Sequence, residues 1–248
     1  MSFEHEALSD LSPIIVDCES APLPNAREYI APPDLDDIAA PKSYVKPKTI
    51  AEYIARERAS RLADYEQDCT SKAALDWNVA RIVALGWWYS RCGDDTPIVR
   101  VCESERYEAV WLAEFWMEAR HRTIVGFCIR TFDLPLLIQR SRYLNVPHPP
   151  LDLGRYARGS HIVDLHDLLT FNDAHSTHVM PRTVRNFARR FGIPVTDPIT
   201  GEDVPRLIAE GNWKAVVDHC RSDVELELAL ARRLGVVPQP VTTEEPVL

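Results

Sequence analysis

The order of the apolar segments constrains the fold of this chain more than any other feature of its sequence. Short apolar runs rich in β-branched and aromatic residues predict strands, and helical periodicity predicts the helices that lie between and after them. The predicted strands are residues 13–17, 79–90, 97–102, 123–127 and 161–164. The predicted helices are residues 49–68, 104–122, 133–144, 181–191 and 212–234, with a further short helix that reaches residue 170. Strands that come early and then alternate with helices are typical of an α/β domain, in which helices flank a mixed sheet.

One domain of residues 12–235 accounts for this pattern. Residues 1–11 form a polar, acidic leader without the apolar stretch of a signal peptide. Residues 20–78 separate the first two predicted strands and form an insertion, which is irregular and rich in proline before its helix begins. Residues 236–248 carry three prolines and are expected to form a disordered tail.

Composition excludes several classes of protein. No apolar run is long enough to cross a membrane, so we expect no membrane partner. The six cysteines are scattered and form no C-x-x-C pair, which favours reduced thiols in a cytoplasmic protein over a disulfide framework or a zinc site. The net charge of −9 disfavours a protein that coats nucleic acid, but a nuclease with bound cations is compatible with it.

Four acidic residues stand at informative positions on these elements. Asp17 and Glu19 are two residues apart at the end of the first strand, so both side chains project from one face. Asp133 opens a predicted helix, and Asp223 follows His219 by four residues on the last helix, which places those two on one face. Each feature alone has an ordinary explanation as a solvated acid, a helix cap or a surface pair. Together they predict an oxygen-rich cage suited to Mg²⁺ or Mn²⁺ and to phosphate chemistry.

These motifs resemble those of the 3′–5′ exonucleases of the DEDD superfamily, above all the proofreading exonuclease domain of family B DNA polymerases and its free-standing bacterial and phage relatives. The matching segments are residues 17–19, 125–140 and 163–165 and the last helix around Asp223. The resemblance covers about residues 12–235 and implies a ribonuclease-H-like fold.

The resemblance also implies a mechanism. Asp17, Glu19 and Asp223 would hold a first divalent ion, and Asp17 would bridge to a second ion that Asp133 reaches. The two ions, Mg²⁺ or Mn²⁺, would activate a water and stabilise the leaving 3′ oxygen. The implied substrate is the 3′ end of single-stranded DNA, and the product is a nucleoside monophosphate.

Two positions depart from the family's pattern. Cys128 stands where the family has an asparagine that contacts the 3′-terminal nucleotide, and Arg130 is an alternative source of that contact. His219 stands in the place of a tyrosine, whereas the sister subclass that uses histidine would place it at Asp218. A histidine with a pKa near neutrality is able to orient or deprotonate the attacking water, so we include His219 among the catalytic residues.

Nucleic-acid contacts are predicted from a basic stripe at helical spacing, Arg182, Arg185 and Arg189, which also fits an ordinary solvated face. Asp164 is either a residue that places the substrate or a helix N-cap. Two other functions remain open at this stage. One is a nucleic-acid-binding or scaffold protein on the same fold with weakened catalysis, and the other is a 3′–5′ exonuclease that acts on RNA.

Overall fold

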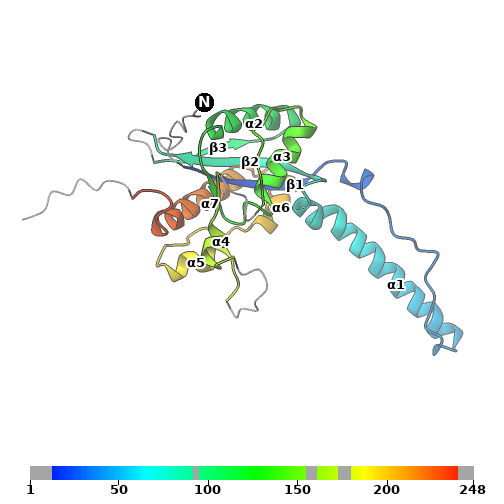
Figure 1. Cartoon of the computed structure of the whole chain (residues 1–248). Helices are drawn as coiled ribbons and strands as arrows, with labels where there is room; N and C mark the ends of the chain where they lie inside the picture. The colour runs from blue at the N-terminus through cyan, green and yellow to red at the C-terminus, as the bar shows by residue number, and fades with distance from the viewer. Residues whose placement is uncertain (1–12, 92–94, 155–160, 173–179, 240–248) are drawn as a thin grey trace, which may run out of the picture.

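The computed structural model describes residues 13–91, 95–154, 161–172 and 180–239 (Figure 1). The leader predicted for residues 1–11 lies outside these ranges, as does most of the tail predicted for residues 236–248. No helix in the described part of the chain is long and apolar enough to cross a membrane.

A mixed sheet of five strands forms the centre of the domain, in the order β3-β2-β1-β4-β5. The strands are β1 (Ile14–Pro22), β2 (Ala80–Tyr89), β3 (Ile98–Val101), β4 (Ile124–Gly126) and β5 (Ile162–Asp164). β1 pairs with β2 antiparallel and with β4 parallel. β2 pairs with β3 antiparallel, and β4 pairs with β5 parallel. The predicted α/β architecture with a mixed sheet is confirmed.

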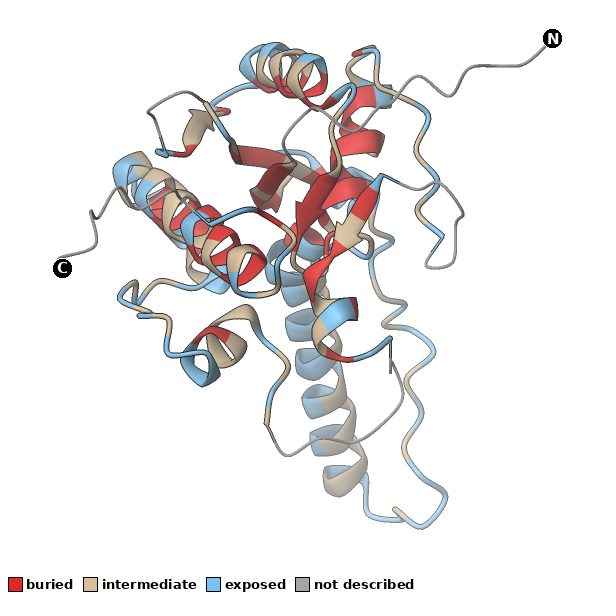
Figure 2. Ribbon diagram, turned by 60° about the vertical axis from the view of Figure 1, so that its left-hand side comes forward, coloured by how far each residue is buried: buried red, intermediate tan, exposed pale blue. Residues whose placement is uncertain are grey.

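Helices cover both faces of the sheet, which explains why the central strands are buried at nearly every position (Figure 2). On one face, α2 (Glu105–Ala119) and α3 (Asp133–Tyr143) pack against Ile14 and Val16. On the other face, α7 (Trp213–Arg233) and α5 (Val184–Arg190) pack against Ile15. Successive residues of β1 therefore belong to different cores.

The sequence missed or misplaced some smaller features. β1 runs through Pro22 rather than ending near Asp17, because residues 20–22 resume pairing with β2 after a bulge between Glu19 and Ser20. The predicted short helix after the fifth strand is α4 (Leu165–Leu169), which follows β5 directly. The helix α6 (Val204–Ala209), which the 3₁₀ turn Gly201–Asp203 precedes, was not predicted.

The insertion contains the helix α1 (Pro47–Gln67), which extends away from the sheet (Figure 1). Proline at its first position suits a helix start, because proline lacks an N–H and the first helical residue has no intrahelical acceptor for one. None of its residues is buried. Ion pairs hold the preceding irregular segment against it; in one of them, Arg61 Nη1 lies 2.5 Å from Asp37 Oδ1. A π-helical turn (Asp68–Lys72) and a 3₁₀ turn (Ala73–Leu75) return the chain from α1 to β2.

A buried ion pair joins α2 to α3. Arg140 Nε lies 2.7 Å from Glu108 Oε1, and the two side chains are 2% and 0% exposed. Glu108 Oε1 also accepts a hydrogen bond from the backbone N–H of Ile82 at 3.0 Å. The pair therefore ties both helices to β2 on the face that carries Asp133.

Candidate active site

β1 supplies the first two acidic side chains of the site. Asp17 and Glu19 alternate with Cys18, so they lie on the face that α7 covers, as period-two geometry requires. Cys18 belongs to the core of the opposite face. The bulge after Glu19 disturbs the register with β2 only beyond both acids.

α7 supplies His219 and Asp223, and a glycine lets the helix approach closely. Gly86 pairs directly with Asp17, and a Cβ atom on it would lie 2.8 Å from both Cys220 Sγ and Val224 Cγ2. Any larger residue at this position would push α7 away from the sheet. Gly86 thus sets the distance between the acids of β1 and those of α7.

α3 supplies Asp133 across the open edge of β1. β4 pairs with β1 only at Ile14 and Ile15, so the N–H of Cys18 lies beyond the paired stretch. Asp133 Oδ1 accepts a hydrogen bond from that N–H at 3.3 Å and one from the Cys18 thiol at 3.2 Å. These contacts bring the start of α3 beside Asp17 and Glu19.

The four acids and His219 line one cleft with a volume of about 640 Å³. Its other walls come from the chain after α1, from Phe132 before α3 and from the 3₁₀ turn before α6. The structure therefore brings together all five residues that the sequence analysis assigned to catalysis.

Burial and mutual repulsion raise the pKa values of these carboxyl groups. For Asp17, burial is the largest cause, followed by the charges of Glu19 and Glu227, and the pKa lies well above its usual range. Burial raises the pKa of Glu19 to about 7, although His219 opposes the shift. Burial raises the pKa of Asp133 to about 6 against the effect of the Cys18 hydrogen bonds. Such a group of acids is unfavourable without a compensating positive charge.

The donor set fits divalent ions. Asp17 Oδ2 and Asp223 Oδ1 are buried, and neither accepts a hydrogen bond from any residue that the structure describes. Buried acceptors without hydrogen-bond partners are costly, and oxygen-binding cations satisfy carboxylates of this kind. Glu19, His219 and Asp223 each offer an atom within 4.8 Å of the other two, a spacing that one ion is able to span.

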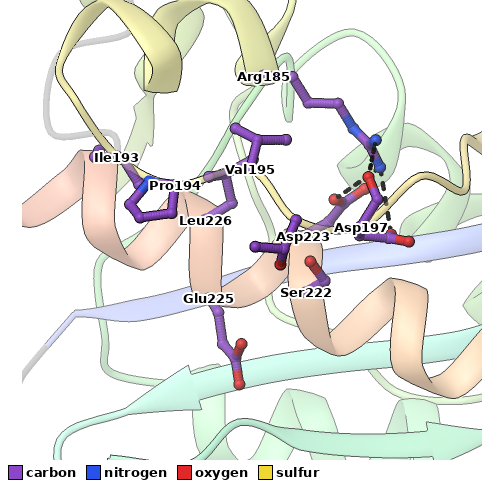
Figure 3. A pocket seen from close by; sticks show the side chains of 10 residues that line it. Arg185, Ile193, Pro194, Val195, Asp197, Ser222, Asp223, Glu225 and Leu226 are labelled. Carbon is purple, nitrogen blue, oxygen red and sulfur yellow. Dashed lines mark hydrogen bonds and ion pairs between the residues drawn. The ribbon is translucent and has the colours of Figure 1, made fainter.

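His219 is held by a carboxylate that lies outside the predicted set. Its Nδ1 lies 2.5 Å from Asp197 Oδ2, and its ring is 1% exposed. Arg185 in turn lies 3.3 Å from Asp197 Oδ2 and 3.7 Å from Asp223 Oδ1 (Figure 3). Burial lowers the pKa of His219, but Glu19, Asp223 and Asp197 together raise it above its ordinary value.

A model of one protein family matches residues 74–228, which is more than half of the chain. The family is described as a predicted 3′-5′ exonuclease related to the exonuclease domain of PolB. The chain belongs to this family. The matched span contains Asp133 and Asp223, whereas Asp17 and Glu19 precede it.

A solved structure supports the same fold for this member of the exonuclease family. The family B DNA polymerase from the hyperthermophilic archaeon Pyrobaculum calidifontis is similar with a TM-score of 0.56 and 19% sequence identity. The match covers 90% of this chain and 24% of the polymerase chain. The predicted ribonuclease-H-like fold and the resemblance to the family B exonuclease domain are confirmed. A search of curated proteins found no match.

Two acidic residues of this predicted exonuclease were missed at the sequence level. Glu227 follows Asp223 by one helical turn and is 3% exposed, and its Oε1 accepts a hydrogen bond from the N–H of Phe127 at 3.1 Å. The four-residue spacing of positions 219, 223 and 227 was a usable signal for it. Asp197 lies in a loop without periodicity, so no local signal marked it.

The residues predicted to contact nucleic acid near β4 have different surroundings. Cys128 lines the cleft in a left-handed conformation, with φ of 56°. Asp164 is the N-cap of α4 and accepts hydrogen bonds from the N–H groups of His166 and Cys128, both at 3.0 Å. Arg130 Nη2 donates to the carbonyl of Ile162 at 2.7 Å. Asp164 and Arg130 therefore brace the loop before α3, and any contact of theirs with nucleic acid stays a prediction.

The predicted arginine stripe is divided. Arg185 turns inward to Asp197 and donates to that residue's backbone carbonyl at 2.7 Å. Arg189 is exposed and lies 3.2 Å from Asn186 Oδ1, while Arg182 is half-buried ahead of α5. The three side chains therefore do not form one solvated face, because helical spacing fixes direction only relative to the helix and not to the loops around it.

The metal-free protein is expected to be more stable at pH 5.5 than at pH 8. The folded-state pKa values of about 7 for Glu19 and about 6 for Asp133 exceed the usual values of about 4.3 and 3.9 in an unfolded chain. At a pH between the unfolded and folded pKa values, the folded state binds more protons than the unfolded state. The free energy of unfolding is therefore highest at low pH and falls, by on the order of 3 kcal/mol, as the pH rises through 7. His219, whose pKa is also raised, adds a contribution of the same sign.

Thermal unfolding in EDTA across this pH range measures the effect. The Glu19→Gln variant serves as the matched comparison, since it removes one of the titrating groups and should flatten the decline. A melting temperature that stays constant or rises between pH 5.5 and pH 8 contradicts the expectation.

Proposed function

We propose that this protein is a metal-dependent 3′–5′ exonuclease that removes nucleoside monophosphates from the 3′ end of single-stranded DNA. The observation that carries the proposal is the convergence of Asp17, Glu19, Asp133 and Asp223 on one cleft, where buried oxygens of Asp17 and Asp223 accept no hydrogen bond from the described residues. Membership of a family of predicted 3′-5′ exonucleases supports the reaction type.

The carboxylates have distinct proposed roles. Asp17, Glu19 and Asp223 would hold a first divalent ion, and Asp17 and Asp133 would hold a second, with Mg²⁺ or Mn²⁺ as the candidates. Two such ions, when bound, polarise the scissile phosphate and lower the pKa of the attacking water. The hydrogen bonds from Cys18 keep the Asp133 carboxylate directed at the cleft before substrate arrives.

The remaining cleft residues suit a frayed 3′ end. Phe132 and Leu75 line the cleft and offer apolar surface to an unpaired base. Lys72 lines the same cleft and carries a charge that suits a phosphate of the strand. The single strand is proposed because an unpaired 3′ end leaves its terminal base free to contact this apolar surface, whereas a base paired in a duplex is not.

The cellular setting is also a proposal. The cysteines at positions 18, 69, 102, 128 and 220 are all free, which fits a reducing compartment such as the cytoplasm.

An oligonucleotide assay tests the function. With Mg²⁺ or Mn²⁺, a 5′-labelled DNA strand should yield a ladder of shorter products, and a 3′-labelled strand should release labelled mononucleotide at once. EDTA should abolish both results. Parallel RNA and duplex substrates report the sugar and strand preference. If the protein binds the strand in a gel-shift assay but never shortens it in the presence of Mg²⁺ or Mn²⁺, the enzymatic proposal is wrong and a binding or scaffold protein is favoured.

A further inference from the structure

We infer that His219 is itself a metal ligand, so that Glu19, His219 and Asp223 form a mixed nitrogen and oxygen site that binds Mn²⁺ in preference to Mg²⁺. The inference rests on the proposed function, because it assigns the residues of the first metal position. It adds an imidazole nitrogen to the carboxylates of Asp17, Glu19 and Asp223 proposed above for the first ion.

The distances fit a common ion. His219 Nε2 lies 3.4 Å from Glu19 Oε1 and 3.6 Å from Asp223 Oδ2. Two ligand atoms that are each about 2.1 Å from a metal, at angles between 90° and 110°, lie roughly 3.0–3.4 Å apart. The three atoms therefore need only small movements to bind one ion.

A carboxylate outside the cluster orients the imidazole. Asp197 Oδ2 accepts from Nδ1 at 2.5 Å, which leaves the lone pair on Nε2 when the ring is neutral. A histidine that ligates a metal commonly donates its other nitrogen to such a carboxylate. Asp197 is itself anchored, since Arg185 Nη1 donates to its backbone carbonyl at 2.7 Å. The ring is thus held with Nε2 directed at Glu19 and Asp223.

The burial of the ring favours a ligand over a general base. With Nδ1 committed to Asp197, Nε2 is the single site for either a proton or an ion. Nε2 faces the carboxylates, and the ring is 1% exposed. A base needs to reach the water that attacks the phosphate, whereas a ligand needs only to face the ion. Because imidazole suits transition metals better than Mg²⁺, this ligand shifts the preference of the site.

Pulsed electron paramagnetic resonance of Mn²⁺ bound to the full chain tests the assignment. The wild-type protein should show modulation from a directly bound ¹⁴N nucleus, and labelling with ¹⁵N-histidine should replace that pattern. The signal should vanish in His219→Gln and persist in His121→Gln, a matched control because His121 is exposed beyond α2. Calorimetry should show Mn²⁺ affinity falling about 10–100-fold in His219→Gln and in Asp197→Asn, with Mg²⁺ affinity changing less.

The outcomes separate the inference from the proposed function. Metal-dependent shortening of DNA without a ¹⁴N signal leaves the exonuclease standing and overturns the ligand assignment. A ¹⁴N signal that depends on His219, without shortening of any DNA or RNA strand, supports the metal site and overturns the exonuclease. Unchanged Mn²⁺ affinity in a folded His219→Gln variant also overturns the inference, and isotope labelling of the wild type keeps the test valid if the variant does not fold.

Discussion

The Asp17→Asn variant is expected to shorten DNA about 10³-fold more slowly or worse, and to be more stable than the wild type when metal is removed. Asp17 is surrounded by Glu19, Glu227, Asp133 and Asp223, all of which raise its pKa after burial itself. Its Oδ2 has no hydrogen-bond partner among the described residues. The carboxylate is therefore unfavourable for folding and is retained for the ions that it binds.

The opposite signs of the two effects have one physical cause. Asparagine keeps the shape of the side chain, removes one negative charge from a buried acidic cluster and offers donors to the neighbouring carboxylates. We expect a gain of about 1–2 kcal/mol in EDTA, which is about 2–8 °C in melting temperature for a chain of this length. The same change removes a ligand shared by both proposed ions, so activity falls.

Thermal melting in EDTA and the labelled-strand assay measure the two effects on one sample. Asp218→Asn is the matched control on α7, because Asp218 is exposed and pairs with Arg221 at 3.2 Å outside the cleft. The control should retain activity near that of the wild type. An Asp17→Asn protein that keeps its activity, or that is destabilised in EDTA, contradicts the account of this site.

The Arg140→Met variant is expected to lose about 3–5 kcal/mol of unfolding free energy, because it leaves a buried charge without its partner. Glu108 is 0% exposed, and its Oε1 accepts a hydrogen bond from Arg140 Nε at 2.7 Å. Methionine fills much of the volume of the arginine stem but offers nothing to the carboxylate. The pair joins α2 and α3, so the start of α3 at Asp133 should loosen as well.

Chemical unfolding in guanidinium chloride measures this loss. Arg142→Met on the same helix is the control, because Arg142 is exposed and its guanidinium lies 3.4 Å from Gln139 Oε1 rather than against a buried carboxylate. The double variant Arg140→Met/Glu108→Gln should recover part of the loss, since glutamine removes the unpaired charge and retains an acceptor for Ile82. If Arg140→Met and the control Arg142→Met lose equal unfolding free energy, the buried ion pair has no special role in stability.

Local patterns in the sequence predicted most of the strands and helices of the fold. Each predicted strand has its counterpart in the sheet, because β-branched runs and turn residues act over a few positions. The pairing of Asp17 with Glu19, and of His219 with Asp223, followed from the periods of strand and helix. The short helix α6 escaped prediction, since six residues hold too little periodicity to be recognised.

The sequence by itself determined which acids this protein carries, on which elements they lie and which of them share a face, because these relations depend on backbone geometry within a few residues. Tertiary structure alone decided that Asp197 holds His219, that Arg185 turns inward and that Glu227 is buried behind Asp223. Asp197 and His219 are separated by 22 positions and by α6, so no local period relates them. Packing of α7 on Gly86 and the path of the preceding loop bring them together, and those contacts exist only in the folded chain.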